Sequence, residues 1–204
     1  MTKVLVLDSA ATGEQSVSRK LIDGLVADLT ARSGGAQIVR RDIGGDPIPH
    51  LGPDTVTAIR TGEASSEAGA KALALSDALI AELRAADVLV IGAPMYNFGI
   101  PSTLKAWFDH VLRARITFRY TENGPEGLVT GKKAIVVESR AGLYSEGPMA
   151  AFDSQEPHLR TLLAFMGITD VTFVRAEKLA FGPEAAEASL AAASGELREL
   201  ALAA

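Results

Sequence analysis

One uninterrupted apolar run, and the loop that ends it, constrain the fold of this chain more than any other feature. The run is Val88-Leu89-Val90-Ile91, and it continues through Gly92-Ala93 into Pro94-Met95-Tyr96-Asn97-Phe98. A short run of aliphatic residues without polar alternation is typical of a strand buried on both faces of a parallel sheet. The sequence therefore predicts an open α/β fold in which residues 95–98 lie at the carboxyl edge of the sheet, where such folds bind ligands.

Strand-like and helix-like segments alternate along the whole chain. The predicted strands are residues 3–7, 37–41, 87–92, 134–139 and 170–175. The predicted helices are residues 16–32, 54–60, 68–86, 102–113, 158–166 and 184–203. Right-handed crossovers then favour a flavodoxin-like, doubly wound, five-stranded parallel sheet with strand order 2-1-3-4-5 and helices on both faces, in a single domain over residues 1–204.

Local signals mark where several of these elements begin and end. Ser33-Gly34-Gly35 is expected to end the first helix, Asp54 to cap the second, and Gly167 to end the fifth. Residues 116–132 carry turn signals, including Asn123-Gly124-Pro125, between short extended pieces. We therefore expect a hairpin-like insertion in that region.

Charge and composition exclude several classes of function. The chain has 20 Lys and Arg against 25 Asp and Glu, and this acidic balance argues against general nucleic-acid binding. It has no cysteine, which removes disulfides, Cys-ligated zinc and iron–sulfur clusters. Its histidines, His50, His110 and His158, have no second ligand at metal-binding spacing, so we expect surface or capping roles for them and no metal.

We also expect a cytoplasmic protein without a membrane partner. The chain contains no run of 18 apolar residues, and a membrane-spanning helix needs about 20. The N-terminus enters a predicted strand by residue 3, a pattern unlike that of a signal peptide.

The 9–18 segment, which links the first strand to the first helix, predicts an anion site. It carries hydroxyl groups at Ser9, Thr12, Ser16 and Ser18 and runs into a helix N-terminus. Unpaired backbone N–H groups and the helix dipole favour a phosphate there, although the same serines could simply cap the helix. Because neither G-x-G-x-x-G nor G-x-x-x-x-G-K-[ST] is present, a mononucleotide phosphate fits better than a dinucleotide.

The 95–98 and 139–142 segments suit a flat ring with polar edges. Met95, Tyr96 and Phe98 offer polarizable and aromatic surface, and Asn97 offers donors and acceptors, a combination that points to a flavin. The small residues of the 139–142 segment let the backbone approach a ring edge closely. The alternatives are a hydrophobic plug at residues 95–98 and a plain turn at residues 139–142.

No side chain stands out as a nucleophile or general base, and there is no G-x-S-x-G elbow. The carboxylates are scattered along helices, mostly as solvated faces. The sequence therefore predicts no catalytic side chain, and it favours a bound cofactor that carries the chemistry.

Two motifs make the chain resemble a known family over essentially its whole length. They are Ala93-Pro94-Met95-Tyr96-Asn97-Phe98 and the run TFRYTENGPEGL at residues 117–128, supported by Leu75-Ser76-Asp77 and Phe165-Met166-Gly167-Ile168. With them the sequence is similar to the bacterial FMN-dependent NADH-azoreductases, which are flavodoxin-like quinone and azo-dye reductases. That family usually has Ser-Arg-Gly-Gly where this chain has Ser139-Arg140-Ala141-Gly142, and often a serine in place of Ala10.

The resemblance implies FMN-binding residues, carried over position by position. It implies phosphate contacts from Ser9, Ser16, Val17 and Ser18. It implies isoalloxazine contacts from Met95, Tyr96, Asn97, Phe98, Ser139, Arg140, Ala141 and Gly142. It further implies a homodimer with one FMN per subunit near an interface that involves residues 102–113 and 116–132, where Tyr120 approaches the partner's flavin and shapes its substrate pocket.

The activity that the resemblance implies has two steps. NADH would reduce FMN and leave, and a quinone or aromatic azo compound would take the same place and be reduced by two electrons, which gives ping-pong kinetics. The rival from another class is a flavodoxin-type electron carrier without substrate turnover of its own, and a flavin-binding regulatory module is a third hypothesis. Reduction of the bound flavin by NADH alone would separate the enzyme from the carrier.

Overall fold

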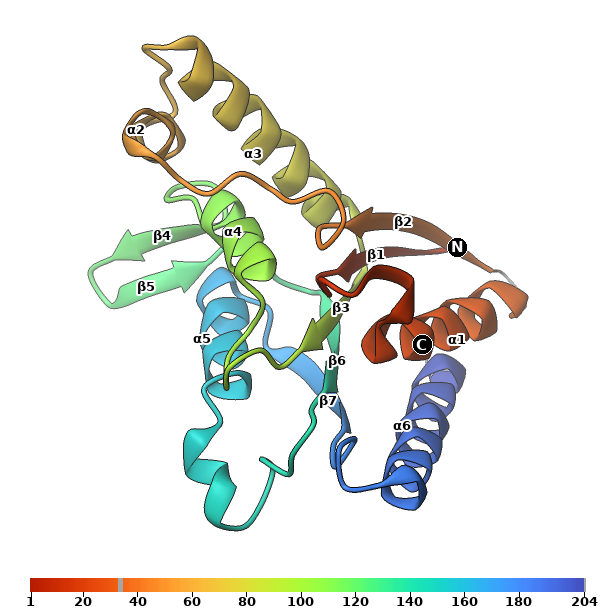
Figure 1. Ribbon diagram of the computed structural model, residues 1–204. Helices are drawn as coiled ribbons and strands as arrows, with labels where there is room; N and C mark the ends of the chain where they lie inside the picture. The colour runs from red at the N-terminus through yellow and green to blue at the C-terminus, as the bar shows by residue number, and fades with distance from the viewer. Residues whose placement is uncertain (33–34, 204) are drawn as a thin grey trace.

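Five parallel strands form the central sheet of the computed structural model, which describes residues 1–32 and 35–203. In spatial order they are β2 (Ala36–Asp42), β1 (Thr2–Asp8), β3 (Val88–Pro94), β6 (Lys133–Ser139) and β7 (Asp170–Ala176). Numbered along the chain without the two hairpin strands, this order is 2-1-3-4-5, so the predicted fold class is confirmed (Figure 1). Ser33 and Gly34, part of the predicted helix stop, lie outside the described residues.

The central strand β3 is buried along its whole length, as its unbroken apolar sequence predicts. It runs two residues further than expected, to Pro94, because its last residues still pair with β6. At the sheet edge, all seven residues of β2 are partly or fully exposed to solvent, in agreement with its polar sequence.

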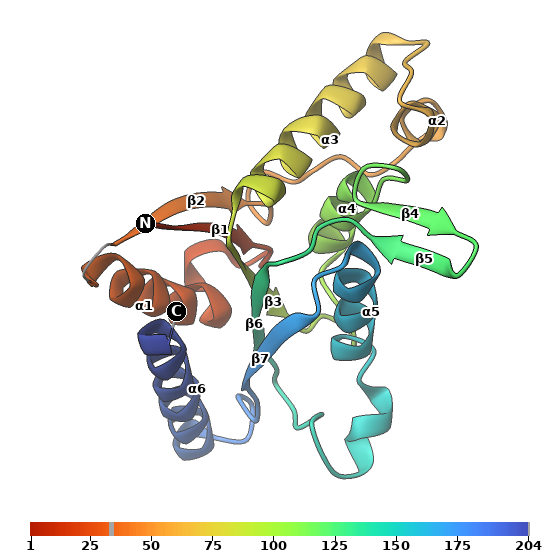
Figure 2. The ribbon, with the colours of Figure 1, turned by 180° about the vertical axis from the view of Figure 1, so that it is seen from behind.

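Helices cover both faces of the sheet, as Figures 1 and 2 show. On one face lie α1 (Val17–Ala31) and α6 (Pro183–Ala203), and on the other α3 (Glu67–Ala85), α4 (Ser102–Val111) and α5 (Glu156–Met166). The alternation of side chains along each strand explains this division: Val4 and Val6 pack toward α1, whereas Leu5 and Leu7 pack toward α3. No helix within residues 1–32 and 35–203 is long and apolar enough to cross a membrane.

Helix α2 (Pro53–Thr61) starts differently from the prediction. Gly52, not Asp54, is its N-cap, and Asp54 lies in the first turn. Proline is favoured at the first helical position because its fixed φ suits the helix and its missing N–H needs no partner. The Gly52 N–H donates to the Thr55 hydroxyl over 2.7 Å, which closes this end. Two short 3₁₀ turns, η1 (Gly13–Gln15) and η2 (Pro148–Phe152), were not predicted because so short a helix shows no periodicity.

The insertion predicted at residues 116–132 contains an antiparallel hairpin of β4 (Phe118–Thr121) and β5 (Gly124–Gly127). It projects beyond the edge of the helical layer near α5 (Figure 1). Its base fits closely against the end of α5: a Cβ atom on Gly127 would lie 2.1 Å from the backbone nitrogen of Gly167. The Val129 N–H also donates to the Met166 carbonyl over 2.8 Å, so the hairpin is attached to the body through α5.

Candidate functional site

The register of the central strands brings the three predicted segments to one edge of the sheet. Asp8 of β1 lies opposite Gly92 of β3, and Pro94 of β3 lies opposite Ser139 of β6. The 9–18, 95–98 and 139–142 segments therefore leave the sheet side by side. The structure therefore brings the predicted cofactor-binding residues to one edge of the sheet, at the carboxyl ends of the strands, where open α/β sheets bind ligands. We call this edge, formed by the 9–18, 95–98 and 139–142 segments, the crevice.

Two hydrogen bonds tie these segments to one another, and a third ties the 9–18 segment to α4. The Ala11 N–H donates to the Tyr96 hydroxyl over 3.0 Å, which joins the 9–18 and 95–98 segments. The Met95 N–H donates to the Ser139 carbonyl over 2.9 Å, which joins the 95–98 and 139–142 segments. The Thr103 hydroxyl at the start of α4 donates to the Ser9 carbonyl over 3.0 Å.

The anion end of the crevice is the N-terminus of α1. Ser16 is the N-cap, and its hydroxyl accepts a hydrogen bond from the Arg19 N–H over 3.3 Å. The Ser18 hydroxyl lies 3.1 Å from that of Ser16, and both side chains are buried. The Val17 and Ser18 N–H groups stand in the first turn, where a helix offers no backbone acceptor, so they can donate to an anion.

The Ser9 hydroxyl is committed inside the fold. It is buried and donates to the Gly92 carbonyl over 2.5 Å, which pins the 9–18 segment to β3. A contact between Ser9 and a phosphate therefore stays a prediction.

The 95–98 segment is a tight turn with a strained backbone. Tyr96 and Gly99 exchange two backbone hydrogen bonds of 3.0 and 3.1 Å, and the residues between them have positive φ angles, 49° at Asn97 and 71° at Phe98. Two consecutive left-handed residues make a type I′ turn, which favours Asn at the first position but disfavours a bulky side chain at the second. Such strain costs of order 1 kcal/mol or more and concentrates at ligand sites.

Turn closure uses the amides of Tyr96 and Gly99, whereas the N–H groups of Asn97 and Phe98 have no hydrogen-bond acceptor within the described part of the chain. They are the backbone donors that this turn can offer to a ring edge.

Two carbonyl groups of the 139–142 segment accept hydrogen bonds from the chain that follows β7. The Ala141 carbonyl accepts from the Ala180 N–H over 3.0 Å, and the Gly142 carbonyl accepts from the Lys178 N–H over 2.8 Å. The N–H groups of Ala141 and Gly142 have no hydrogen-bond acceptor among the described residues, so they are candidate donors. Within the described residues a positive φ occurs at neither of them, so alanine at position 141 fits without backbone strain.

The side chain of Arg140 turns into the protein rather than toward the crevice. Its guanidinium is fully buried, with Nη2 2.7 Å from Glu138 Oε2 and Nη1 3.1 Å from Glu177 Oε1. Its Nε donates to the Gln155 Oε1 over 3.0 Å. The expected isoalloxazine contact of Arg140 can therefore come only from its backbone.

Most carboxylates of the described residues are exposed or partly exposed, as expected, but Glu138 and Glu177 beside Arg140 are buried. Burial raises the pKa of Glu138 to about 8, although Arg140 acts in the opposite direction. Burial also acts to raise the pKa of Glu177, but hydrogen bonds from Ser145, from the Tyr144 N–H and from Arg140 hold it below its usual value.

His110 corrects the expectation of surface or capping histidines. Its side chain is buried, and its Nε2–H donates to the Pro49 carbonyl over 3.0 Å. Burial lowers the pKa of His110, since the charged form would lose its hydration. His50 is exposed and His158 is partly buried.

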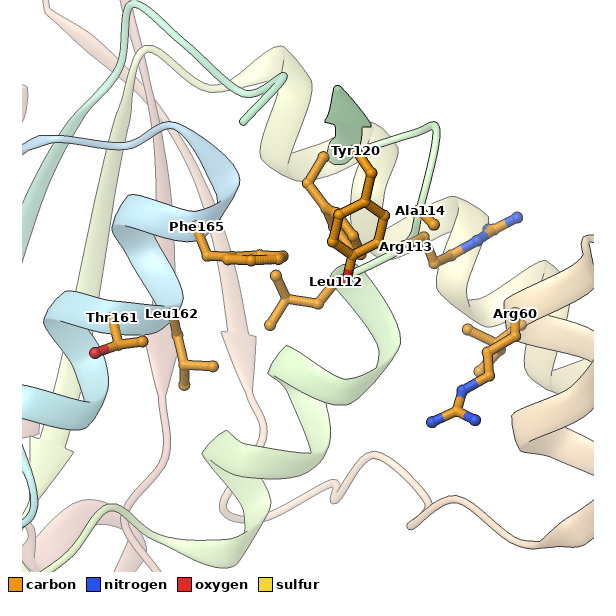
Figure 3. A pocket seen from close by; sticks show the side chains of 10 residues that line it. Arg60, Leu112, Arg113, Ala114, Tyr120, Thr161, Leu162 and Phe165 are labelled. Atoms are coloured by element: carbon orange, nitrogen blue, oxygen red, sulfur yellow. The ribbon is translucent and has the colours of Figure 1, made fainter. Parts of the chain in front are cut away.

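Tyr120 lies at a different place, a cavity of about 630 Å³ between α2, the end of α4, the hairpin and α5 (Figure 3). Its walls are largely apolar and aromatic: the ring centroid of Phe118 lies 4.6 Å from that of Phe165 and 5.6 Å from that of Tyr120. Tyr120 is 73% exposed. The lining contains no residue of the 9–18, 95–98 or 139–142 segments, so the structure does not bring Tyr120 to the crevice of its own chain.

Sequence reasoning missed Gln155 and Glu177, which hold Arg140 in place, because nothing in the pattern around them differs from an exposed helix start or loop. The burial of Glu138 could have been predicted, because a charged residue inside the apolar strand AIVVES needs a partner.

Comparison with known proteins places this geometry in a family. Residues 2–201 match a family model described as the flavodoxin-like fold. The chain belongs to this family. Within flavodoxin-like proteins it is 54% identical to an FMN-dependent NADH:quinone oxidoreductase of Hyphomonas neptunium over 98% of this chain and 96% of that protein. It is 49% identical to the enzyme of the same name from Azotobacter vinelandii, over 98% of this chain and 100% of that protein.

Solved structures of flavodoxin-like proteins agree with these sequence relatives. An azoreductase of Bacillus anthracis superposes with a TM-score of 0.89 at 32% identity, over 98% of this chain and 99% of that one. An FMN-dependent NADH-azoreductase of Bacillus anthracis in complex with FMN also superposes with a TM-score of 0.89, at 26% identity, over 99% of this chain and 98% of that one. The resemblance drawn from the two motifs is confirmed.

Proposed function

We propose that this chain is an FMN-dependent oxidoreductase that uses NADH to reduce quinones and aromatic azo compounds, as a cytoplasmic homodimer with ping-pong kinetics. The observation that carries the proposal is the crevice itself. A free helix N-terminus, a strained turn with aromatic side chains and a loop with free amides meet at one sheet edge. Together they supply a phosphate site, a ring site and backbone donors.

The residues present fit a flavin mononucleotide. The N–H groups of Val17 and Ser18 would hold its phosphate, with the helix dipole favouring the negative charge. Gly142 is required beside the Tyr144 ring: a Cβ atom on it would lie 2.9 Å from that ring, too close for any other residue without a shift. Side chains of the 95–98 turn would form one wall of the ring site.

Bound FMN supplies hydride chemistry, accepting two electrons from NADH and delivering two to the acceptor. The chain's own contribution is electrostatic. The N–H groups of Ala141 and Gly142 would donate to the polar edge of the ring and stabilise negative charge that reduction places there. A single open ring face would serve both substrates in turn, which is the basis for proposing ping-pong kinetics.

The place of Tyr120 supports a homodimer. Its largely exposed ring stands on the projecting hairpin, above an apolar cavity that contains none of the crevice residues of the same chain. A second copy that laid its crevice against this cavity would cover both, and Tyr120 would then shape the pocket above the partner's flavin.

The decisive experiment is to purify the protein, identify its flavin and add NADH without oxygen. The denatured protein should release FMN and not FAD, and NADH alone should bleach the bound flavin. Initial rates against NADH at several quinone concentrations should then give parallel lines. Release of FAD, or no flavin after reconstitution, would overturn the cofactor assignment. A flavin that NADH leaves oxidised would favour the electron-carrier alternative.

A further inference from the structure

Gln155 connects two of the crevice segments from behind. Its side chain is fully buried at the N-cap of α5. Its Nε2 donates to the Ala93 carbonyl over 2.8 Å, and its Oε1 accepts from Arg140 Nε over 3.0 Å. Ala93 is two residues before the 95–98 segment, and Arg140 belongs to the 139–142 segment. One amide group therefore contacts the bases of both.

The neighbours of Gln155 extend this connection. The Ser154 N–H donates to the Phe98 carbonyl over 3.0 Å, at the strained position of the turn. Asp153 Oδ1 accepts from the N–H groups of Gln155 and Glu156 over 2.8 and 3.1 Å, which fixes the start of α5. The segment that begins α5 thus holds the 95–98 turn at Phe98 and the end of β3 that leads into it at Ala93.

Arg140 extends the connection from Gln155 to Glu177, which follows β7. Its Nη1 donates to Glu177 Oε1 over 3.1 Å, and the same oxygen accepts from the N–H groups of Tyr144 and Ser145 over 2.9 and 3.0 Å. The chain that follows the 139–142 segment is thereby held by the end of β7. The polar chain runs from the Ala93 carbonyl through Gln155, Arg140 and Glu177 to the Tyr144 amide.

This polar chain lies on the face of the sheet whose hydrophobic core is built from aliphatic and aromatic side chains. Buried polar groups are expensive unless every partner is present, and when satisfied they fix a single geometry. Gln155 has no exposed surface, so it cannot touch a ligand itself. Its polar ends instead fix the distance between two segments that do face the crevice.

We propose that Gln155 is a positioning residue that sets the separation of the 95–98 and 139–142 segments and so fixes the width of the ring site. This inference rests on the proposed function, since the two segments are its flavin-binding walls. Gln155 acts through the backbone amides that it aligns. Its loss should therefore change flavin affinity and flavin potential, which a purely structural residue on the same helix would leave unchanged.

The test compares Gln155→Leu with Leu163→Ala, a buried residue further along α5 whose apolar side chain belongs to the core and cannot hydrogen-bond to either segment. FMN affinity is measured by titrating the apoprotein, and the two-electron midpoint potential is measured on the reconstituted protein. Gln155→Leu should raise the FMN dissociation constant about tenfold, from the loss of two buried hydrogen bonds. Its potential should become more negative, because amides that stabilise the reduced ring are no longer aligned. Leu163→Ala should lower the unfolding midpoint and change neither quantity.

Gln155→Glu covers the case in which the leucine variant does not fold. A glutamate keeps an acceptor for Arg140 but places an oxygen against the Ala93 carbonyl, so only the link to β3 is lost. Its dissociation constant should rise about threefold or more. Equal FMN affinity and potential in the wild type and in either Gln155 variant would overturn the inference and leave the proposed function standing. A wild-type protein that binds no FMN would overturn the proposed function itself.

Discussion

The Tyr96 hydroxyl accepts a hydrogen bond from the backbone N–H of Ala11 over 3.0 Å, and this contact joins the phosphate side of the crevice to its ring side. Tyr96 thus serves two purposes: its ring belongs to the aromatic turn, and its hydroxyl orders the 9–18 segment. The two halves of the predicted cofactor site are coupled through one side chain.

Tyr96→Phe should weaken FMN binding about threefold to tenfold with little change in stability. Ala11 is exposed, so water can replace the lost acceptor in the folded protein, while the segments become less well ordered before binding. FMN titration of the apoprotein measures this, beside thermal unfolding. Tyr144→Phe is the matched control, since the Tyr144 hydroxyl makes no hydrogen bond in the part of the chain that the structure describes. Equal FMN affinity in both variants would contradict the coupling.

Ser16→Asp should reduce FMN affinity by about tenfold or more and leave the fold intact. Aspartate caps helices as well as serine does, but its charge would repel a phosphate at the same N–H groups. Ser16→Asn, a neutral cap, should retain most of the affinity. Ser66→Asp makes the same change at the N-cap of α3, where the serine accepts from the Gly69 N–H over 3.1 Å, and should have no effect on FMN binding. Full flavin retention by Ser16→Asp would place the phosphate elsewhere.

Substitutions at Phe98 should reveal the strain in the turn. Its φ of 71° suits glycine and disfavours a β-branched residue, and its ring centroid lies 5.7 Å from that of Phe152 and 6.1 Å from that of Tyr144. Phe98→Gly and Phe98→Val both lose these ring contacts, but only the glycine variant relieves the strain. The valine variant should therefore be less stable than the glycine variant by about 1–3 kcal/mol of unfolding free energy in urea titrations. Equal stability of the two variants would mean that the turn relaxes.

Tyr120→Ala should alter acceptor kinetics without altering FMN affinity. The ring belongs to the aromatic wall of the cavity, and losing one aromatic pair corresponds to an increase of up to about tenfold in the KM for quinones. Tyr120→Phe should behave as wild type, and Glu122→Ala at the tip of the same hairpin is the control for a general disturbance.

Light scattering of the purified protein should give twice the monomer mass. Unchanged quinone and azo-dye kinetics would refute the pocket role, and a monomer mass would refute the dimer.

The buried carboxyl of Glu138 should make the protein less stable as pH rises from about 5 to 8. Its pKa is raised from 4.5 to about 8 by burial, so the folded state keeps a proton that the unfolded chain releases above 4.5. The stabilisation is complete below pH 4.5 and is lost as pH rises toward 8. Glu138→Gln should remove this decline, a difference on the order of 4 kcal/mol at pH 8, since the pKa rises from 4.5 to about 8 and one pKa unit corresponds to about 1.4 kcal/mol.

Other groups do not mimic this effect. Hydrogen bonds from Arg175 and Arg160 hold the pKa of Glu156 below 4.5 despite its burial, so its contribution changes only at more acidic pH. Burial lowers the pKa of His110 below 6.5, which makes stability rise with pH through that value, the opposite sign. The free energy of unfolding in urea, measured at pH 5, 6.5 and 8 for wild type, Glu138→Gln and Glu156→Gln, separates the contributions of these groups to stability. Parallel pH curves for wild type and Glu138→Gln would show that Glu138 is ionised in the folded protein.

Much of the fold follows from local periodicity. Three features depend only on neighbours in sequence, and each is found where the sequence places it. They are the apolar run at β3, the leucines at every fourth position of α1 (Leu21, Leu25 and Leu29) and the helix start at Ser16. The start of α2 was misplaced because Pro53 at the first helical position competes with Asp54 as a start signal.

The parts of the site that the sequence does not reveal depend on contacts between distant segments. Arg140 and Gln155 are polar residues that would ordinarily be assigned to the surface, and their burial follows only when β6, β7 and α5 are packed together. The cavity beside Tyr120 likewise draws its walls from four separate elements. Strain at Phe98 is invisible because no turn motif marks it.

The attachment of the β4–β5 hairpin has a consequence for sequence change. It contributes no strand to the central sheet and joins the body at its base, through the close approach of Gly127 and Gly167. Its tip can therefore change in length and sequence while the sheet and the crevice stay intact. Exchange of this one peripheral module would leave the residues at the carboxyl edge of the sheet in place.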